Sequence, residues 1–307
     1  MDLFVSFILN GIGNGAIYAS VALALVLIFR TTGLLNLAQG EMALFSTYFA
    51  WWLTSSFGMS IFLAIPVTIV ASMAGGAAIE RTLIRPVYGP GKSQLNVLIV
   101  MLGMFLALNA LAQLLFSDQA EPMPKPWPTN SSAGDPTGSS QIVEVLGQRI
   151  SWATIALAIA LVVECVVLYV LFQRTKLGLK LRAVANNTES ARLVGINSSA
   201  MLMLGWALSA GLGAFAGTLA ASARGSVNPG LMAIILVYAF SAAALGGFDS
   251  PVGAVVGGMV VAIAEALTIG YVDALSGIEL VVPFGIILLV LLVRPQGLFG
   301  RREVERV

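Results

Sequence analysis

The chain has 307 residues, of which 58% are hydrophobic and only 10% are charged, and its mean hydropathy is +0.93. A soluble domain needs roughly a quarter of its residues charged, so this composition excludes a soluble protein and indicates a polytopic membrane protein. The net charge of +1 gives no indication of nucleic-acid binding. Histidine is absent and Cys165 is the single cysteine, so we predict no catalytic, cofactor or metal site in this chain.

Nine apolar runs follow one another along the chain, and most approach the roughly 20 residues that a helix needs to cross a bilayer. They cover residues 4–29, 34–54, 61–80, 95–116, 152–172, 201–221, 231–246, 252–271 and 278–293. The seventh and ninth runs are short and are interrupted by Gly246, Gly247 and Pro283. One such pair is therefore compatible with a re-entrant segment instead of two full crossings. The sequence predicts an all-α fold with about nine (8–10) transmembrane helices in a single domain, 1–307.

The basic residues give the predicted orientation. With nine spans, thirteen of the 16 Lys and Arg residues fall on one side of the membrane. Because cytoplasmic loops are enriched in basic residues, we predict a periplasmic N-terminus and a cytoplasmic C-terminus. Only three basic residues then lie outside, namely Lys125, Arg149 and Arg224. Those inside are five in the segment 173–197, together with Arg30, Arg81, Arg85, Lys92, Arg294, Arg301, Arg302 and Arg306.

Two long polar segments separate the runs. Residues 117–150 are rich in Pro, Gly and Ser, and we predict an irregular extracytoplasmic loop there. Residues 173–200 carry five basic residues, which places them on the cytoplasmic side.

The sequence GPGKS at 89–93 is similar to the end of a phosphate-binding P-loop. Pro86 stands where the first glycine belongs, and no strand precedes the segment to aim backbone N–H groups at a phosphate. We therefore predict a simple turn between the third and fourth runs and assign any ATP chemistry to another subunit.

The first two runs contain polar side chains that are costly in hydrocarbon. Such residues usually face a bundle interior or an aqueous path, so we take Asn10, Asn14, Asn36, Gln39 and Glu41 as candidates for a translocation path. Asn36 and Gln39 are three residues apart and share a helical face, whereas Glu41 is rotated away. Helix packing with interhelical hydrogen bonds is an alternative role for these residues, and we weigh it equally with the path.

Two carboxylates, Glu164 and Glu265, fall inside the fifth and eighth runs. A proton relay and a structural hydrogen-bonding role are both open, and we favour the structural one. Small residues in the sixth and eighth runs predict close helix packing, with a subunit interface as an extension. These are Gly211, Gly213, Gly217, Gly253, Gly257 and Gly258.

Within 173–200, NNTESARLVGI predicts a short amphipathic helix that Thr188 caps and Gly195 ends. The order Glu189, one residue, Ala191, three residues, Gly195 resembles the EAA motif of ABC importer permeases, with Ser190 at its second position. In that family the motif is the helix that docks into ATPase subunits. The resemblance implies a cytoplasmic coupling loop at 173–200. Its coupling residues would be Thr188, Glu189, Ala191, Arg192 and Gly195.

Three further stretches resemble permeases of the high-affinity branched-chain amino-acid uptake family, of the Liv type and its H-type subunit. They are GNGAIYASVALALVLIFRTTGLLNLAQGEM, ALGGFDSPVGAVVGG and VRPQGLFG. The resemblance implies a non-enzymatic, multi-pass permease subunit of an ATP-driven ABC importer for Leu, Ile and Val in the bacterial cytoplasmic (inner) membrane. It also implies a second permease subunit in a heterodimer, two cytoplasmic ATPase subunits, and a periplasmic or lipid-anchored substrate-binding protein.

One departure concerns residues 36–40. The family commonly has Asn-Phe-Ala-His-Gly where this chain has Asn-Leu-Ala-Gln-Gly, so Gln39 replaces a histidine and cannot titrate near neutral pH. Urea or short-chain amides remain alternative cargoes within the same architecture. A secondary transporter driven by protons through Glu164 or Glu265 is an alternative of another class, and a purely structural membrane scaffold ranks last.

Overall fold

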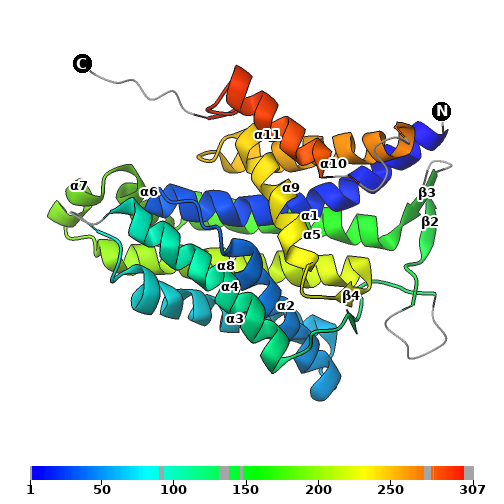
Figure 1. Ribbon diagram of the computed structural model, residues 1–307, viewed down its shortest axis with the longest axis horizontal. Helices are drawn as coiled ribbons and strands as arrows, with labels where there is room; N and C mark the ends of the chain where they lie inside the picture. The colour runs from blue at the N-terminus through cyan, green and yellow to red at the C-terminus, as the bar shows by residue number, and fades with distance from the viewer. Residues whose placement is uncertain are drawn as a thin grey trace.

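The computed structural model describes residues 2–89, 93–130, 138–145, 148–272, 278 and 280–300. Each predicted apolar run coincides with a helix (Figure 1). The helices are α1 (Asp2–Thr32), α2 (Gln39–Ser56), α3 (Ile61–Ile79), α4 (Gln94–Leu115), α5 (Trp152–Arg174), α8 (Ser198–Arg224), α9 (Leu231–Gly246), α10 (Pro251–Tyr271) and α11 (Val281–Val293). A π-helical turn, η1 (Glu80–Ile84), continues α3.

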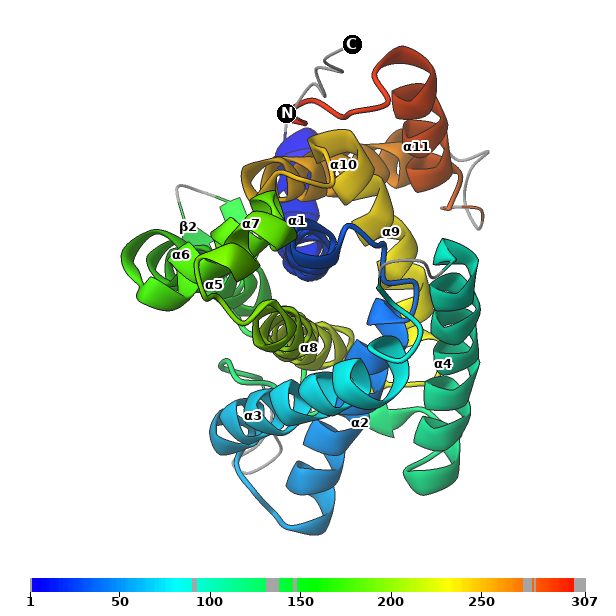
Figure 2. The ribbon, with the colours of Figure 1, turned by 90° about the vertical axis from the view of Figure 1, so that its left-hand side faces the viewer.

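Six of these helices are long and apolar enough to cross a membrane: α1, α3 with η1, α4, α5, α8 and α10. The fold is therefore that of a helical, polytopic membrane protein. Helices α9 and α11 are shorter, with 16 and 13 residues, and α9 lies across the long axis of the bundle (Figures 1 and 2). The predicted count of nine crossings thus stays a prediction.

Helix α1 is the centre of the bundle. Every residue from Gly15 to Ile28 is buried, and α1 packs against α5, α8, α9 and α10. In Figure 2, where α1 is seen along its axis, these helices surround it. A helix that is apolar on all sides is stable only when it is covered on all sides, which explains its place in the core.

Small residues let the neighbours approach α1 and one another closely, as predicted. A Cβ atom added to Gly258 of α10 would lie 2.7 Å from the backbone N and Cα of Ala19 in α1. Gly253 and Gly257 in turn face the backbone of α9 at Gly246 and Ala242. Gly211, Gly213 and Gly217 of α8 face α3 and α2. All six glycines serve contacts within the chain, and their extension to a subunit interface stays a prediction.

The segment between α4 and α5 is more regular than we expected. Strand β1 (Glu121–Pro122) pairs antiparallel with β4 (Ser226–Val227), and β2 (Ile142–Val145) pairs antiparallel with β3 (Gln148–Ser151). The Trp127 indole N–H donates to the Ser140 hydroxyl at 2.7 Å. Backbone groups outside a helix need hydrogen-bond partners, and these short strand pairs supply them.

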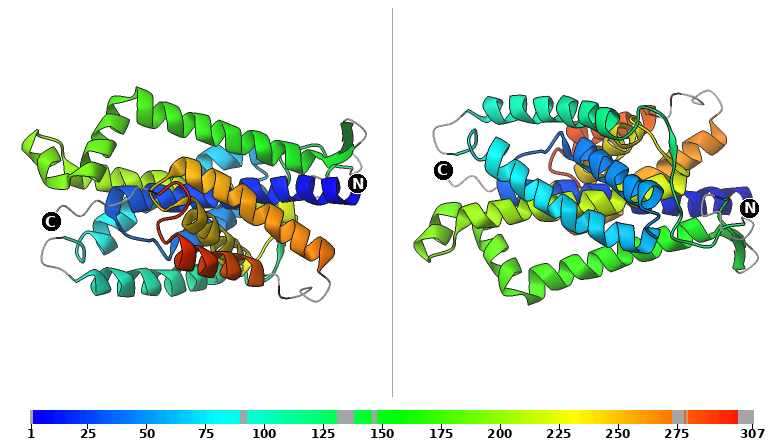
Figure 3. Two further views of the ribbon diagram at one scale, coloured as in Figure 1. Left: turned by 90° about the horizontal axis from the view of Figure 1, so that it is seen from above. Right: turned by 90° about the horizontal axis from the view of Figure 1, so that it is seen from below.

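The two polar segments lie at opposite ends of the bundle (Figures 1 and 3). The β2–β3 pair lies at the end where α1 begins. Two short helices, α6 (Lys176–Asn186) and α7 (Thr188–Leu193), lie at the other end. This separation agrees with the predicted topology, although which end faces the cytoplasm stays a prediction. Of the basic residues used to predict it, four lie outside the described residues: Lys92, Arg301, Arg302 and Arg306.

Replacing Gly258 by Ala is expected to lower the thermal stability of the purified protein, because the new methyl group would collide with the backbone of α1 at Ala19. Overpacking of this kind costs roughly 1–3 kcal/mol. Gly103→Ala in α4 is the matched control, since a Cβ there has no atom within 4 Å. Equal melting temperatures for the two variants in detergent would contradict the proposed close contact.

Candidate functional site

The predicted cytoplasmic loop is folded into two helices. Helix α5 ends at Arg174, Thr175 caps α6 by accepting a hydrogen bond from the Gly178 N–H at 3.0 Å, and α7 follows. Gly178 lies so close to the backbone at Phe172 that no side chain fits there. The chain therefore turns sharply at the end of α5. We had predicted only one helix, and α6 is an addition to that prediction.

Asn187, not Thr188, is the N-cap of α7. The Asn187 side chain accepts a hydrogen bond from the Ser190 N–H at 2.8 Å, while the Thr188 hydroxyl donates to the Val184 carbonyl at 3.1 Å. Asn187 has the extended backbone that an N-cap needs, so Thr188 becomes the first residue of the helix. Gly195 has φ +81° and terminates the helical segment as predicted.

Helix α7 divides its side chains between the bundle and the outside. Ala191 is buried, whereas Glu189 and Arg192 are exposed. Leu193 and Val194 are also exposed, at 89% and 75%. Two adjacent apolar side chains are therefore exposed within an otherwise polar segment. We had not included either residue among the coupling candidates, although both are apolar residues directly before the terminating glycine.

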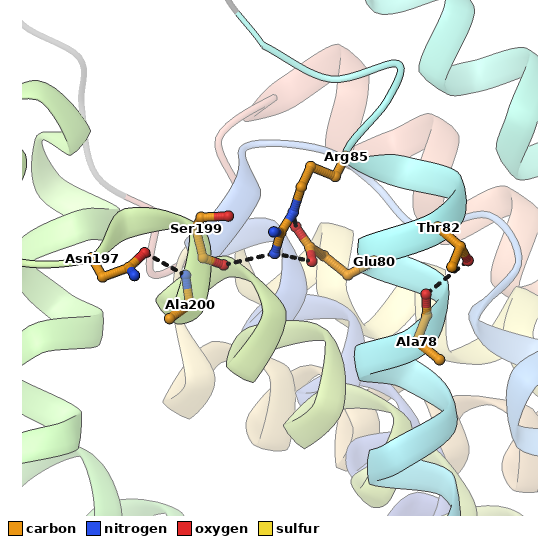
Figure 4. Close-up of polar contacts among 7 residues, drawn as sticks. All are labelled: Ala78, Glu80, Thr82, Arg85, Asn197, Ser199 and Ala200. Carbon is orange, nitrogen blue, oxygen red and sulfur yellow. Dashed lines mark hydrogen bonds and ion pairs between the residues drawn. The ribbon is translucent and has the colours of Figure 1, made fainter.

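An ion pair holds the base of this segment. The buried carboxylate of Glu80 in η1 accepts hydrogen bonds from Nε and Nη2 of Arg85 at 3.2 and 2.8 Å. Arg85 Nη2 also lies 3.5 Å from the carbonyl oxygen of Ser199 at the start of α8 (Figure 4). The pair thus joins the end of α3 to the segment that follows α7. We had counted Arg85 only as a topology marker.

Asn36 and Gln39 come together with Ser209 of α8 in the core. Asn36 Nδ2 donates to Gln39 Oε1 at 3.1 Å, and Gln39 Nε2 donates to the Ser209 carbonyl at 3.0 Å. The Ser209 hydroxyl lies 2.9 Å from both Gln39 Oε1 and the Ala24 carbonyl of α1. All three side chains are fully buried. The hydrogen bonds of Asn36, Gln39 and Ser209 thus join α1, α2 and α8, which favours a role in helix packing. A role of Asn36 and Gln39 in the translocation path stays a prediction.

Glu41 points to a different part of the bundle, as its rotation on the helix predicted. Its Oε2 accepts a hydrogen bond from Asn109 Nδ2 of α4 at 2.8 Å, and Oε1 has no partner among the described residues. Asn109 also donates to the Pro229 carbonyl at 3.1 Å. Asn10 and Asn14 lie near the start of α1, one exposed and one half-buried. The five predicted path residues therefore occupy three separate places.

The two other carboxylates within apolar helices have partners on α1. Glu164 of α5 accepts a hydrogen bond from Ser20 at 2.5 Å, and Glu265 of α10 accepts one from Tyr18 at 2.8 Å. Both side chains are buried. These bonds support the structural role that we favoured, because each carboxylate links its helix to the central one.

With this geometry established, comparison with known proteins identifies the family. Residues 7–291 match the family model of the branched-chain amino acid transport system permease component. The chain belongs to this family. The high-affinity branched-chain amino acid transport system permease protein BraD of Pseudomonas aeruginosa is 30% identical over 312 residues, covering 99% of this chain and 98% of BraD. LivH of Escherichia coli, a permease protein of the same description, is 29% identical with the same coverage.

A solved structure has the same fold as this chain. PsaBC from Streptococcus pneumoniae in complex with Fab superposes with a TM-score of 0.50 and 15% sequence identity. The superposition covers 94% of this chain and 92% of that one. At this identity the likeness concerns the fold alone. The resemblance predicted from the sequence motifs is thus confirmed at the level of the family.

Gln39→Ala is expected to destabilise the protein, because it removes an acceptor from Asn36 and a donor from the buried Ser209 carbonyl. Leaving buried polar groups unpaired costs about 1–3 kcal/mol each. Thermal unfolding and membrane abundance measure this, with Gln119→Ala, at an exposed position, as the control. Unchanged stability with an altered uptake rate would instead identify Gln39 as a path residue.

Arg85→Gln is expected to lower thermal stability more than Arg81→Gln does. The first substitution leaves the Glu80 carboxylate buried without its cationic partner, which is strongly destabilising, whereas Arg81 is exposed. Melting temperatures of the two variants test this directly. Similar values would show that the ion pair contributes little to the base of the segment.

Proposed function

We propose that this chain is the membrane-spanning permease subunit of an ATP-driven importer that moves branched-chain amino acids, Leu, Ile and Val, across the bacterial inner membrane. Membership of the family over residues 7–291 is the observation that carries the proposal. The chain is a transport subunit and no enzyme, and separate subunits hydrolyse the ATP. In this role it crosses the membrane nine times, with a periplasmic N-terminus and a cytoplasmic C-terminus.

Helix α7 is the element that docks into an ATPase subunit. Its exposed apolar tip, Leu193 and Val194, suits a hydrophobic groove on a partner, and Glu189 and Arg192 flank it with opposite charges. Ala191 packs on the bundle, and Gly195 and Asn187 fix the two ends of the helix. These contacts support α7 as a firmly placed docking element.

The same proposal includes the other components. A second permease subunit forms a heterodimer with this chain, two cytoplasmic ATPases bind one to each permease, and a periplasmic or lipid-anchored binding protein delivers the substrate at the opposite end. Near-full-length similarity to BraD and LivH, both permease proteins of transport systems, supports such an assembly. The β2–β3 pair and the β1–β4 pair lie at the end that the binding protein would meet.

Transport in this scheme requires two packings of the helices with similar free energy, which ATPase closure and the loaded binding protein bias in turn. Close contacts between small residues suit such rearrangement, because helices with few protruding side chains slide past one another without rotamer changes. Asn10, Asn14, Asn36, Gln39 and Glu41 remain candidates for the path, and the last three offer polar groups in the core once their present contacts change.

Gly195→Ala is expected to reduce substrate-stimulated ATP hydrolysis and uptake by the reconstituted complete transporter. Gly195 has φ +81°, a left-handed conformation that costs a side-chain-bearing residue about 1–2 kcal/mol, so Ala shifts the end of α7.

Gly58→Ala is the matched control for this prediction. Gly58 has φ +61°, and neither glycine has an atom within 4 Å of an added Cβ, so the two substitutions cause similar strain. Gly58 lies between α2 and α3, away from α7. Normal coupling in Gly195→Ala, or an equal loss in both variants at equal membrane abundance, would refute docking through α7.

A further inference from the structure

A cleft of about 380 Å³ opens beside α1, at the end of the bundle that carries α7. Helices α5 and α6 form one wall and the start of α10 the other, and Figure 2 shows these helices on two sides of α1. The interior is apolar, with Leu27, Leu168 and Val255 among its lining residues. This volume is in the range of about 300–1,000 Å³ that is usual for sites of small ligands.

The mouth of the cleft is polar and basic. Arg30, Gln173 and Arg182 line it, and Arg182 Nη1 donates to Gln173 Oε1 at 3.1 Å. The Nε of Arg182 is buried and has no hydrogen-bond partner among the described residues. This nitrogen is closed to a ligand in the cleft, but Arg182 itself lines the cleft, and its guanidinium charge there suits a ligand with an anionic oxygen.

The lining residues include no carboxylate. Glu164 is next in sequence to Cys165 of the lining, but its side chain accepts a hydrogen bond from Ser20 of α1 instead. A free amino acid would need an acceptor for its ammonium group as well as a cation for its carboxylate. The lining supplies the cation, but its oxygen acceptors, such as Gln173 Oε1, are neutral, so no anion balances the charge of an ammonium group.

In the membrane orientation proposed above, on which this inference rests, α6 lies at the level of the lipid headgroups. It is amphipathic: Leu181 and Val184 are buried against the bundle, and the exposed residues include Lys176 and Lys180. The chain turns sharply at Gly178 after the apolar helix α5, so α6 runs across the bundle rather than along it (Figure 3). A basic amphipathic helix in this position lies in the membrane interface.

We propose that the cleft binds one anionic phospholipid. The Arg182 guanidinium holds the phosphate, and an acyl chain lies along Leu27, Leu168 and Val255. Basic pockets between transmembrane helices at the cytoplasmic side recognise anionic headgroups in this way, and the guanidinium suits phosphate geometry. Because α6 passes directly into α7 through Asn187, a lipid that joins α6 to α1 also fixes the position of α7.

Cys165 gives an internal probe, since it lines the cleft and is the only cysteine of the chain. The complete transporter is reconstituted in nanodiscs of phosphatidylcholine alone or with phosphatidylglycerol. The rate at which a maleimide alkylates Cys165 is then followed by mass spectrometry of its peptide. Phosphatidylglycerol is expected to slow alkylation several-fold. Arg182→Gln is expected to abolish this protection, and Arg174→Gln, at an exposed position outside the cleft, to retain it.

Equal rates in the two membranes, or protection that survives Arg182→Gln, would overturn the proposal. Protection by inorganic phosphate in phosphatidylcholine would assign the site to a free anion and also overturn it. If Arg182→Gln does not insert, Ala185→Trp at the exposed edge of the cleft replaces it, and must remove the lipid dependence. The readout involves neither uptake nor ATP hydrolysis, so its failure is distinct from failure of the proposed transport function.

Discussion

The bundle depends on the close approach of other helices to α1. Inside a bilayer the hydrophobic effect gives helices little reason to associate, so packing must come from close van der Waals contact and from hydrogen bonds. Glycine supplies the contact from both sides: Gly11 and Gly15 of α1 face Ile263 and Met259 of α10, and Gly205 of α8 faces Thr31. The contacts of Gly11 and Gly15 include main-chain atoms of α10, so an added methyl group there would displace the backbone of a neighbouring helix.

Hydrogen bonds then fix which helix lies on which side of α1. Tyr18 and Ser20 are two residues apart, so they point in directions that differ by roughly 200° around the helix. Tyr18 meets Glu265 of α10 and Ser20 meets Glu164 of α5, on opposite sides. The Tyr18 ring also stacks on Tyr238 of α9, with ring centroids 4.5 Å apart. Buried carboxylates are expensive in hydrocarbon, and the hydrogen bonds that Glu265 and one oxygen of Glu164 accept depend on one correct arrangement of the helices.

The sequence predicted the helices well because apolar length alone determines whether a segment can span a bilayer. It placed Asn36 and Gln39 on one helical face, which is wrong, because Asn36 lies in a turn before α2; the two side chains nevertheless hydrogen-bond each other. Other features depend on partners that are distant in the chain. The β1–β4 pair joins Glu121 to Val227, and Arg85 reaches the Ser199 carbonyl at 3.5 Å. Apolar spacing predicted a short amphipathic helix around Ala191, but only the structure shows that Leu193 and Val194 are exposed, because spacing alone does not say which apolar side chains pack on the bundle.

The length of helix α8 links the two ends of the bundle. It is one unbroken, proline-free helix of 27 residues, about 40 Å long at 1.5 Å per residue. One end begins directly after α7, and the other leads into β4, which pairs with the β1 strand of the outer segment. A rod of this length that tilts by about 5° moves its far end by about 3.5 Å. In the proposed transporter, such a tilt would transmit a displacement from the end of the bundle near α7 to the end near β4 through a single element.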